Sequence, residues 1–275
     1  MAAFAILFLT LPLLLLAIAI FGAWLEGRRS PYSFGMGRVL SNAFSAIGGA
    51  PLALLAASAL LNAPIQLLLP MLLRNGTDVT RVESVAASMA PFGLLWLLVY
   101  PFVTLFMARV ALDTLAGQPV DMGGALRMAL RRMLPALAVV ILLGIGLIVG
   151  FLFLIVPGIF LMLTWFIVIP VMAAEGQRVF GCFGRSAQLL RGMRWRLLLL
   201  LIIVGVLWMI ASGVVQGVGL ALFGNSGNLW GLSILQALVS TIVGVLGATG
   251  TAAIYHEART AKEGSGNHDL EAVFA

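Results

Sequence analysis

The chain has 275 residues, of which 62% are hydrophobic and 9% charged, and its mean hydropathy is +1.12. This composition excludes an ordinary soluble globular domain. The net charge of +6 comes from cations in short segments between apolar stretches, where anionic lipid headgroups lie. We therefore predict an integral membrane protein that does not bind nucleic acid.

Seven apolar stretches are long enough to cross a membrane as helices, for which about 20 residues are needed. We predict an all-α fold: a polytopic helical membrane protein with about seven transmembrane helices, six plus an extra N-terminal span. The predicted spans cover residues 3–24, 50–73, 87–109, 135–155, 157–174, 197–221 and 231–254.

The first stretch differs from a cleaved signal peptide, because residues 1–10 contain no Lys or Arg and Arg28–Arg29 follow it. We expect it to be retained as a span. The predicted organisation has three parts, which are an N-terminal transmembrane span at 1–27, a helical membrane domain at 28–258 and a disordered cytoplasmic tail at 259–275.

The basic residues predict the orientation of the chain. Of the 16 Lys and Arg residues, all but Arg74 and Arg81 follow the first, third, fifth or seventh span. Because positively charged loops stay in the cytoplasm, we predict a multi-pass protein of the cell (inner) membrane. Its N-terminus should lie outside and its C-terminus in the cytoplasm.

Three amphipathic segments, 34–48, 120–134 and 178–196, each precede a pair of spans. Helices of this kind lie in the membrane interface, with apolar side chains in the lipid and cations toward the phosphates. We predict three cytoplasmic interfacial helices. Their expected apolar faces comprise Met36, Val39, Leu40, Ala43 and Ile47; Met122, Leu126, Ala129, Leu130 and Met133; and Val179, Phe183, Ala187, Leu190 and Met193.

Proline and glycine mark features inside the spans. Residues 156–158, Val-Pro-Gly, interrupt the apolar block 135–174, which predicts two spans joined by a tight turn. Prolines inside spans predict kinks, and small residues predict close helix packing. The prolines are Pro64, Pro101 and Pro170, and the glycines are Gly146, Gly150, Gly213, Gly217, Gly244, Gly247 and Gly250.

Neutral polar residues form a candidate polar path. Asn62 and Gln66 share a helical face around Pro64, and Gln216 lies in the sixth span. These amides can form hydrogen bonds between helices, or they can line a route for a polar substrate. The sequence leaves both interpretations open.

Motifs for catalysis or metal binding are missing from the sequence. The one cysteine, Cys182, excludes an intrachain disulfide and a multi-cysteine metal site, and His256 and His268 lie at or beyond the last span. No P-loop, His-x-x-x-His or Gly-x-Ser-x-Gly motif occurs in a suitable context. We predict no catalytic, cofactor-binding or metal-binding residues, and no enzymatic activity.

Basic residues near the predicted cytoplasmic ends of spans are candidate contacts for lipid headgroups. They can anchor the chain, or they can recognise anionic lipid, and the sequence supports both interpretations. The candidates are Arg127, Arg131, Arg132, Arg185, Arg191, Arg194 and Arg196.

One region resembles a known family. The residues Val156-Pro157-Gly158-Ile159, Trp165, Pro170, Glu175 and Arg185-Ser186-x-x-Leu189-x-x-Gly192-x-x-Trp195-Arg196 are similar to the membrane domain associated with glycerophosphoryl diester phosphodiesterases. The resemblance extends over residues 32–260. It implies a small multi-span protein, in some relatives joined to a cytoplasmic phosphodiesterase barrel. Since the residues after 256 are too few for a barrel of about 250 residues, we do not expect that activity here.

These features lead to one expected function and one alternative. We expect a non-enzymatic membrane-organising or accessory protein that interacts with anionic phospholipid, and with a membrane-protein partner or a second copy of itself. The alternative is a transporter or permease component for a lipid or small amphiphile.

Overall fold

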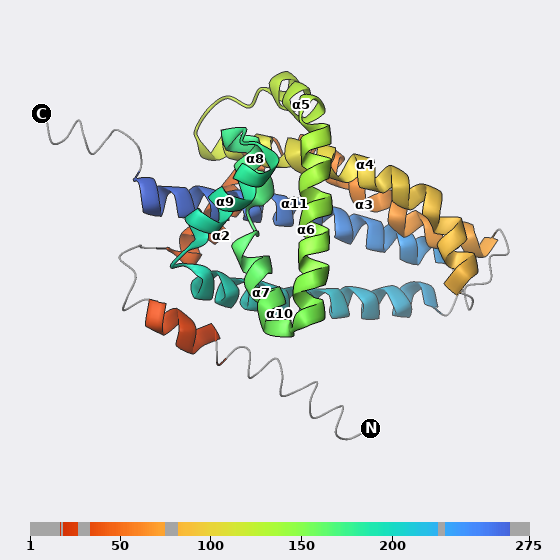
Figure 1. Ribbon diagram of the computed structural model, residues 1–275. Coiled ribbons are helices and arrows are strands. Elements are labelled where there is room, and N and C mark those ends of the chain that lie inside the picture. The colour runs from red at the N-terminus through yellow and green to blue at the C-terminus, as the bar shows by residue number, and fades with distance from the viewer. Residues whose placement is uncertain (1–16, 18, 27–33, 75–81, 225–228, 265–275) are drawn as a thin grey trace, which may run out of the picture.

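The computed structural model is helical and contains no strand in the part of the chain that it describes (Figure 1). The predicted all-α class is therefore confirmed. The described residues are 17, 19–26, 34–74, 82–224 and 229–264.

The described chain contains both short and long helices (Figure 1). They are α2 (Met36–Gly48), α3 (Pro51–Arg74), α4 (Val82–Leu115), α5 (Met122–Arg131), α6 (Met133–Phe153), α7 (Ile155–Thr164), α8 (Val168–Glu175), α9 (Val179–Leu190), α10 (Arg194–Gly219), the π-helical turn η1 (Leu220–Gly224) and α11 (Leu229–Glu263).

Six helical stretches within the described residues are long and apolar enough to cross a membrane. They coincide with six of the seven predicted spans. Most of the predicted first span, 3–24, lies outside the described residues. Residues 19–26, which the structure does describe, are helical. The six stretches are Pro51–Leu68, Met89–Leu115, Met133–Phe153, Ile155–Glu175, Arg194–Phe223 and Leu229–Glu263.

Helix α11 is the centre of the packing. It lies against α3, α2 and α4, and its C-terminal part also meets α8 and α9. Ala252, Ala253 and Ala258 are fully buried there, together with core residues of α2, α4, α8, α9 and α10. Small side chains on α11 therefore allow several helices to approach one axis.

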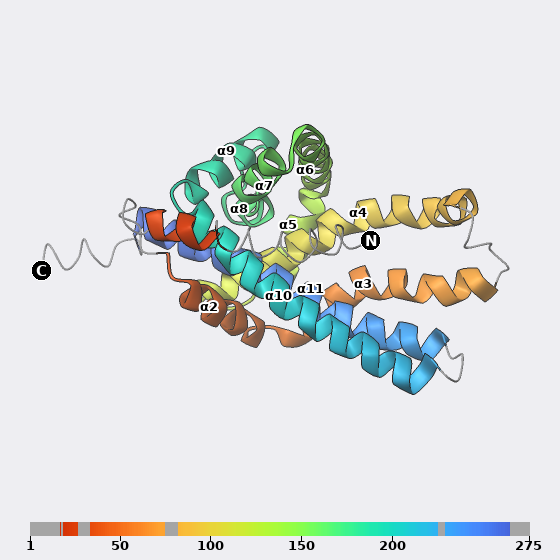
Figure 2. The ribbon, with the colours of Figure 1, turned by 90° about the horizontal axis from the view of Figure 1, so that it is seen from below.

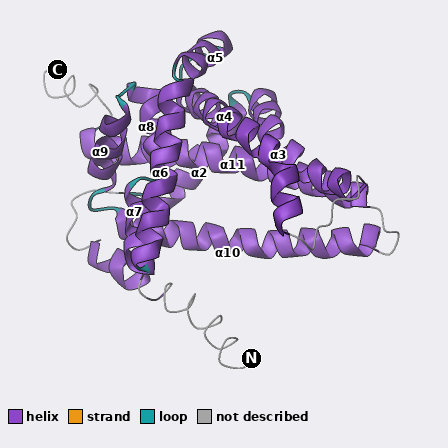
Figure 3. Cartoon of the chain, turned by 45° about the vertical axis from the view of Figure 1, so that its right-hand side comes forward, coloured by secondary structure: helices purple, strands orange, loops and turns teal. Residues whose placement is uncertain are grey.

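The long helices do not all run in the same direction. Helices α3, α4, α10 and α11 extend roughly together, whereas α6 runs across them and is seen nearly end-on in Figure 2. Helix α10 lies along the edge of the molecule (Figure 3), and only 11% of its apolar stretch is buried. Most of the α10 surface is thus available to lipid.

The break between the two spans of 135–174 lies earlier than predicted. Leu154 is extended (φ −169°, ψ 152°) and separates α6 from α7, while Pro157 and Gly158 lie in the first turn of α7. Proline fits this turn because the first N–H groups of a helix have no partner within it. A Cβ on Gly150 would lie 3.2 Å from the Gly158 Cα, so α6 and α7 pack backbone to backbone.

A second break divides the fifth span at residues 165–167, between α7 and α8. Pro170 lacks the N–H that would bond to the carbonyl of Phe166, which accounts for an interruption at this position. Helices α3 and α4 continue through Pro64 and Pro101.

Two predicted boundaries are wrong. The segment 178–196 is not one helix, because Gly192 adopts a left-handed conformation (φ 84°) and α10 begins at Arg194. The predicted tail 259–275 begins too early, since α11 continues to Glu263. Arg259 and Glu263 form an ion pair of 3.1 Å along this last turn.

Much of the predicted apolar face of two amphipathic segments packs inside the protein. Val39 and Ala43 of α2 are buried, as are Leu190 of α9 and Met193 in the following turn. On α2, only Leu40 of the predicted face is clearly exposed, at 43%. These faces therefore contribute mainly to the protein core.

The contact between α3 and α11 depends on Gly244. A side chain there would overlap the Ser58 hydroxyl, and its Cβ would lie 2.6 Å from Asn62 Nδ2. The neighbouring Gly247 has no atom within 4 Å of the corresponding position. Close helix packing is therefore confirmed at Gly244. It is also confirmed at Gly146, where a Cβ would overlap Trp165, and at Gly150, where it would overlap Leu161.

We predict that Gly244→Val destabilises the protein by about 1–3 kcal/mol, because the added methyl groups overpack the α3–α11 contact. The measurement is thermal unfolding in detergent. Gly247→Val is the matched control and should leave the melting temperature nearly unchanged. Equal losses in both variants would contradict the packing explanation.

Candidate lipid-headgroup interface

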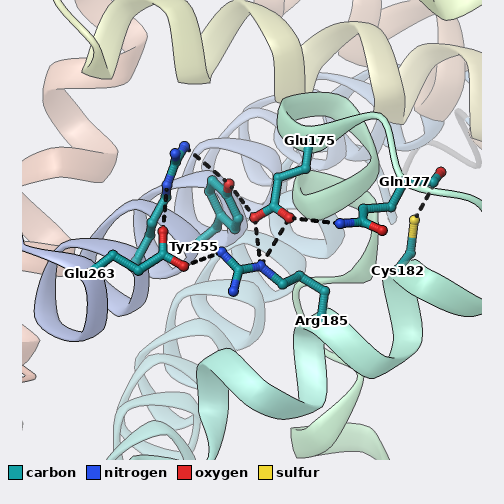
Figure 4. Close-up of polar contacts among 7 residues, drawn as sticks. Glu175, Gln177, Cys182, Arg185, Tyr255 and Glu263 are labelled. Atoms are coloured by element: carbon teal, nitrogen blue, oxygen red, sulfur yellow. Dashed lines mark hydrogen bonds and ion pairs between the residues drawn. The ribbon is translucent and has the colours of Figure 1, made fainter. Parts of the chain in front are cut away.

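A polar network joins α8, α9 and α11 (Figure 4). Arg185 Nε donates to both carboxylate oxygens of Glu175 at 2.9 Å, and the Tyr255 hydroxyl donates to Oε1 of Glu175 at 3.0 Å. Arg185 also forms an ion pair with Glu263. Burial lowers the pKa of Arg185, but the hydrogen bonds to Glu263 and Glu175 outweigh it and raise that pKa overall.

The network begins where α8 ends. Gly176 takes a left-handed conformation (φ 65°) that terminates the helix directly after Glu175. Arg132 Nη1 donates to the carbonyl of Met172 at 3.4 Å, at the negative end of the α8 dipole. Arg132, predicted as a headgroup contact, thus links the start of α6 to the end of α8.

A buried carboxylate ties α2 to α11. Glu257 is 4% exposed, and its Oε1 accepts from the Gly35 N–H at 3.0 Å and from Arg38 Nε at 2.8 Å. The carboxylate therefore caps the N-terminus of α2 and neutralises Arg38. The hydrogen bond from Arg38 to Glu257 raises the pKa of the arginine.

Three further cations gather near the start of α10. The Arg194 guanidinium lies 4.4 Å from the ring centre of Phe160, and its Nε is buried with no hydrogen-bond partner among the described residues. Lys262 donates to the carbonyl of Gln188, and its charge is repelled by Arg191 and Arg194. These side chains come from two parts of the chain, the junction of α9 with α10 and the end of α11.

A carboxylate lies at the N-terminus of α10. Glu26 Oε2 accepts from the backbone N–H groups of Trp195 at 3.1 Å and Arg196 at 3.2 Å. A side chain at Gly22 would overlap the Trp195 ring, so residues 19–26 lie directly against α10. The N-terminus of a helix attracts anions, and at α10 the Glu26 carboxylate occupies this site.

The seven candidate arginines therefore separate into groups. Arg132 and Arg185 are used in contacts within the protein, whereas Arg191 and Arg194 lie together. The remaining three arginines are not part of this pair. Arg127 and Arg131 are exposed on α5, and Arg196 donates its backbone N–H to Glu26.

The residues of the candidate polar path are not all brought together. Asn62 Nδ2 donates to the Ser58 carbonyl at 2.9 Å, and Ser58 donates to the Thr241 carbonyl of α11 at 2.7 Å. Gln66 lies partly buried on the same helix. Gln216 is exposed on α10, whose main contacts are with α7, α11, α2 and η1 rather than α3.

Several polar residues that join helices were missed from sequence. Ser58 had a usable signal, since it precedes Asn62 by four residues and so shares its helical face. Glu257, Tyr255 and Lys262 had none, because their partners on α2, α8 and α9 are remote in the chain.

Among the described residues, no group of three or more His, Cys, Asp or Glu side chains could hold a metal ion. Cys182 is fully buried, and its Sγ lies 3.6 Å from the carbonyl of Gln177. Burial, chiefly, raises the pKa of this thiol to about 11. The thiolate, which is the nucleophile, is therefore scarce near neutral pH.

We predict that Cys182 does not react with maleimide in the folded protein at pH 7–8, because it is buried and protonated. Intact mass after labelling provides the measurement. The same reagent should modify Cys182 fully in denaturant, and Cys182→Ala controls for other nucleophiles. Rapid labelling of the native protein would contradict the burial described here.

Part of the chain matches a family model. Residues 135–258 match the model of a domain of unknown function, DUF7847. This region runs from α6 into the C-terminal part of α11 and includes the α7–α9 assembly. No curated protein and no solved structure matches the chain.

Proposed function

We propose that this chain is a non-enzymatic accessory or membrane-organising protein that binds anionic phospholipid at one end. The supporting observation is the charge balance of residues 175–196 and 255–263, which we call the charged end. Its carboxylates, Glu175, Glu257 and Glu263, all take part in ion pairs. Because seven cations accompany these three carboxylates, positive charge remains for lipid phosphates.

Helix α5 offers a second contact with lipid. Met122, Leu126 and Leu130 follow one another at four-residue intervals and are exposed at 38%, 46% and 58%. Arg127 and Arg131 are exposed beside them. An exposed apolar stripe flanked by arginines is typical of a helix in the membrane interface, and it supports the interfacial placement of α5.

We also propose that the chain is related to the membrane domain associated with glycerophosphoryl diester phosphodiesterases. The residues behind the resemblance take part in contacts among α7, α8 and α9, and two of them, Arg185 and Glu175, contact each other. Trp165 packs edge to face on Phe183 at 5.0 Å, and Ser186 donates to the Thr164 carbonyl at 2.8 Å. Packing accounts for these residues without a hydrolytic reaction.

The transporter alternative has one supporting feature, the interruption between α7 and α8. Interrupted spans are common at transporter binding sites. Here, however, Ser186 already bonds to the carbonyl of Thr164 at the break, and Gln216 lies away from Asn62. We therefore favour lipid binding.

The proposed topology has seven spans, with the connections 75–81 and 225–228 outside and the charged end in the cytoplasm. Both arms of the hairpin, Met133–Phe153 and Ile155–Glu175, are long and strongly apolar. This supports its insertion into the membrane. Since α6 runs across α10 and α11, full insertion alongside them requires the hairpin to turn relative to the other helices (Figure 1).

Cysteine labelling tests this topology. Cysteines placed at Asn75, Ser226 and Leu154 should react with a charged maleimide from outside, whereas cysteines at Gly124 and Gly192 should not. Labelling of the Gly192 position from outside would reverse the orientation. If the Leu154 position stays unreactive while Asn75 reacts, the hairpin lies across the other helices and does not span.

The proposed function is tested by lipid selectivity of the unmodified protein in nanodiscs. Native mass spectrometry should detect more bound phosphatidylglycerol than phosphatidylcholine from an equal mixture. The preference should fall as salt is raised, because ions screen exposed charges beyond about 10 Å at 0.1 M. Equal binding of the two lipids at low salt would refute the proposal.

A further inference from the structure

We propose that Arg191, Arg194 and Lys262 form one binding site for the phosphate group of an anionic lipid, and that Glu26 competes with this phosphate. The inference rests on the proposed lipid-binding function and extends it to a defined site with a regulator in the same chain.

The three cations converge although they belong to different elements. Arg191 lies in the turn after α9, Arg194 opens α10, and Lys262 lies in the last turn of α11. The Gln188 carbonyl accepts from the Arg191 backbone N–H at 3.4 Å and from Lys262 Nζ, so the end of α11 meets the turn that carries Arg191 and leads into Arg194. Folding therefore brings like charges together here, at a cost that a bound anion would remove. A carboxylate of Glu263 is close in sequence, but Arg185 and Arg259 already bind it.

Arg194 has unused hydrogen-bonding capacity. Its guanidinium is held against the Phe160 ring, and its buried Nε lacks an acceptor within the described chain. A buried donor without an acceptor is costly, so a side-chain shift that lets a phosphate oxygen reach this Nε would be stabilising. The planar guanidinium also suits phosphate geometry.

The surroundings favour a lipid over free phosphate. Phe160 is 51% exposed and Trp195 40% exposed beside the cations, and the apolar side chains of α10 beyond residue 203 are largely exposed. A lipid could place its phosphate on the cations and its acyl chains along α10. Indole rings favour this boundary between headgroups and acyl chains.

Glu26 supplies an anion to the same place from within the chain. Its carboxylate accepts two backbone N–H groups at the start of α10, and it is close enough to attract the charge of Arg194. A phosphate approaching Arg194 would be repelled by this carboxylate. Lipid binding and Glu26 docking should therefore oppose each other.

The experiment compares variants of the full chain in nanodiscs containing phosphatidylglycerol and phosphatidylcholine. Arg191→Gln/Arg194→Gln/Lys262→Gln should lower affinity for phosphatidylglycerol by about tenfold or more, since each cation contributes about 1 kcal/mol near an anionic surface. Glu26→Gln keeps a hydrogen-bond acceptor but removes the charge, and should raise that affinity about fivefold. The control Arg127→Gln/Arg131→Gln removes two arginines of the proposed α5 contact with lipid, and it should lower that affinity less than the triple variant does because salt screens their exposed charges.

Each result has a defined meaning. A gain of affinity in Glu26→Gln cannot come from misfolding, so together with the loss in the triple variant it would support the site. If the wild type prefers phosphatidylglycerol, the proposed function stands. The inference is then wrong if the triple variant and the α5 control lose the same affinity, or if Glu26→Gln leaves the affinity unchanged. Displacement of the lipid by an equal concentration of inorganic phosphate would overturn a lipid as the ligand.

Discussion

The C-terminal part of α11 carries hydrogen-bonded charges on which the arrangement of the surrounding helices depends. Glu257 holds α2 through Gly35 and Arg38, while Tyr255 and Glu263 reach the Glu175–Arg185 pair of α8 and α9. Ion pairs at partly buried positions contribute little unless their remaining hydrogen bonds are satisfied. Here each carboxylate has several donors, which makes the contacts specific in geometry and fixes which helices meet α11.

Small residues complement these polar contacts farther along the same helix. Gly244 allows α3 to approach closely enough for Ser58 to bond to the Thr241 carbonyl. In α6 and α7, Gly150 and Gly158 play the same part. Association of apolar helices in lipid relies on such close packing and on hydrogen bonds between helices, because apolar side chains gain little by leaving lipid for protein.

The charged end combines arginines that pair with carboxylates and a group of neighbouring cations. Arg185 and Arg38 are neutralised by carboxylates, and they belong to the framework. Arg191 and Arg194 lie near Lys262, and the carboxylates of the charged end pair with Arg38, Arg185 and Arg259. This division separates arginines that shape the protein from those suited to bind a ligand. Counting arginines along the chain could not make that distinction.

The sequence by itself determined the helical class, the position of six apolar helices and the segregation of cations, because these follow from length, composition and order along the chain. It also located the break near Pro157 to within a few residues. The tertiary structure alone decided that α6 runs across α10, that Arg185 pairs with Glu263, and that Lys262 joins Arg194. Such pairings join residues far apart in sequence, and local patterns of hydrophobicity and charge contain no information about which remote partner a side chain meets.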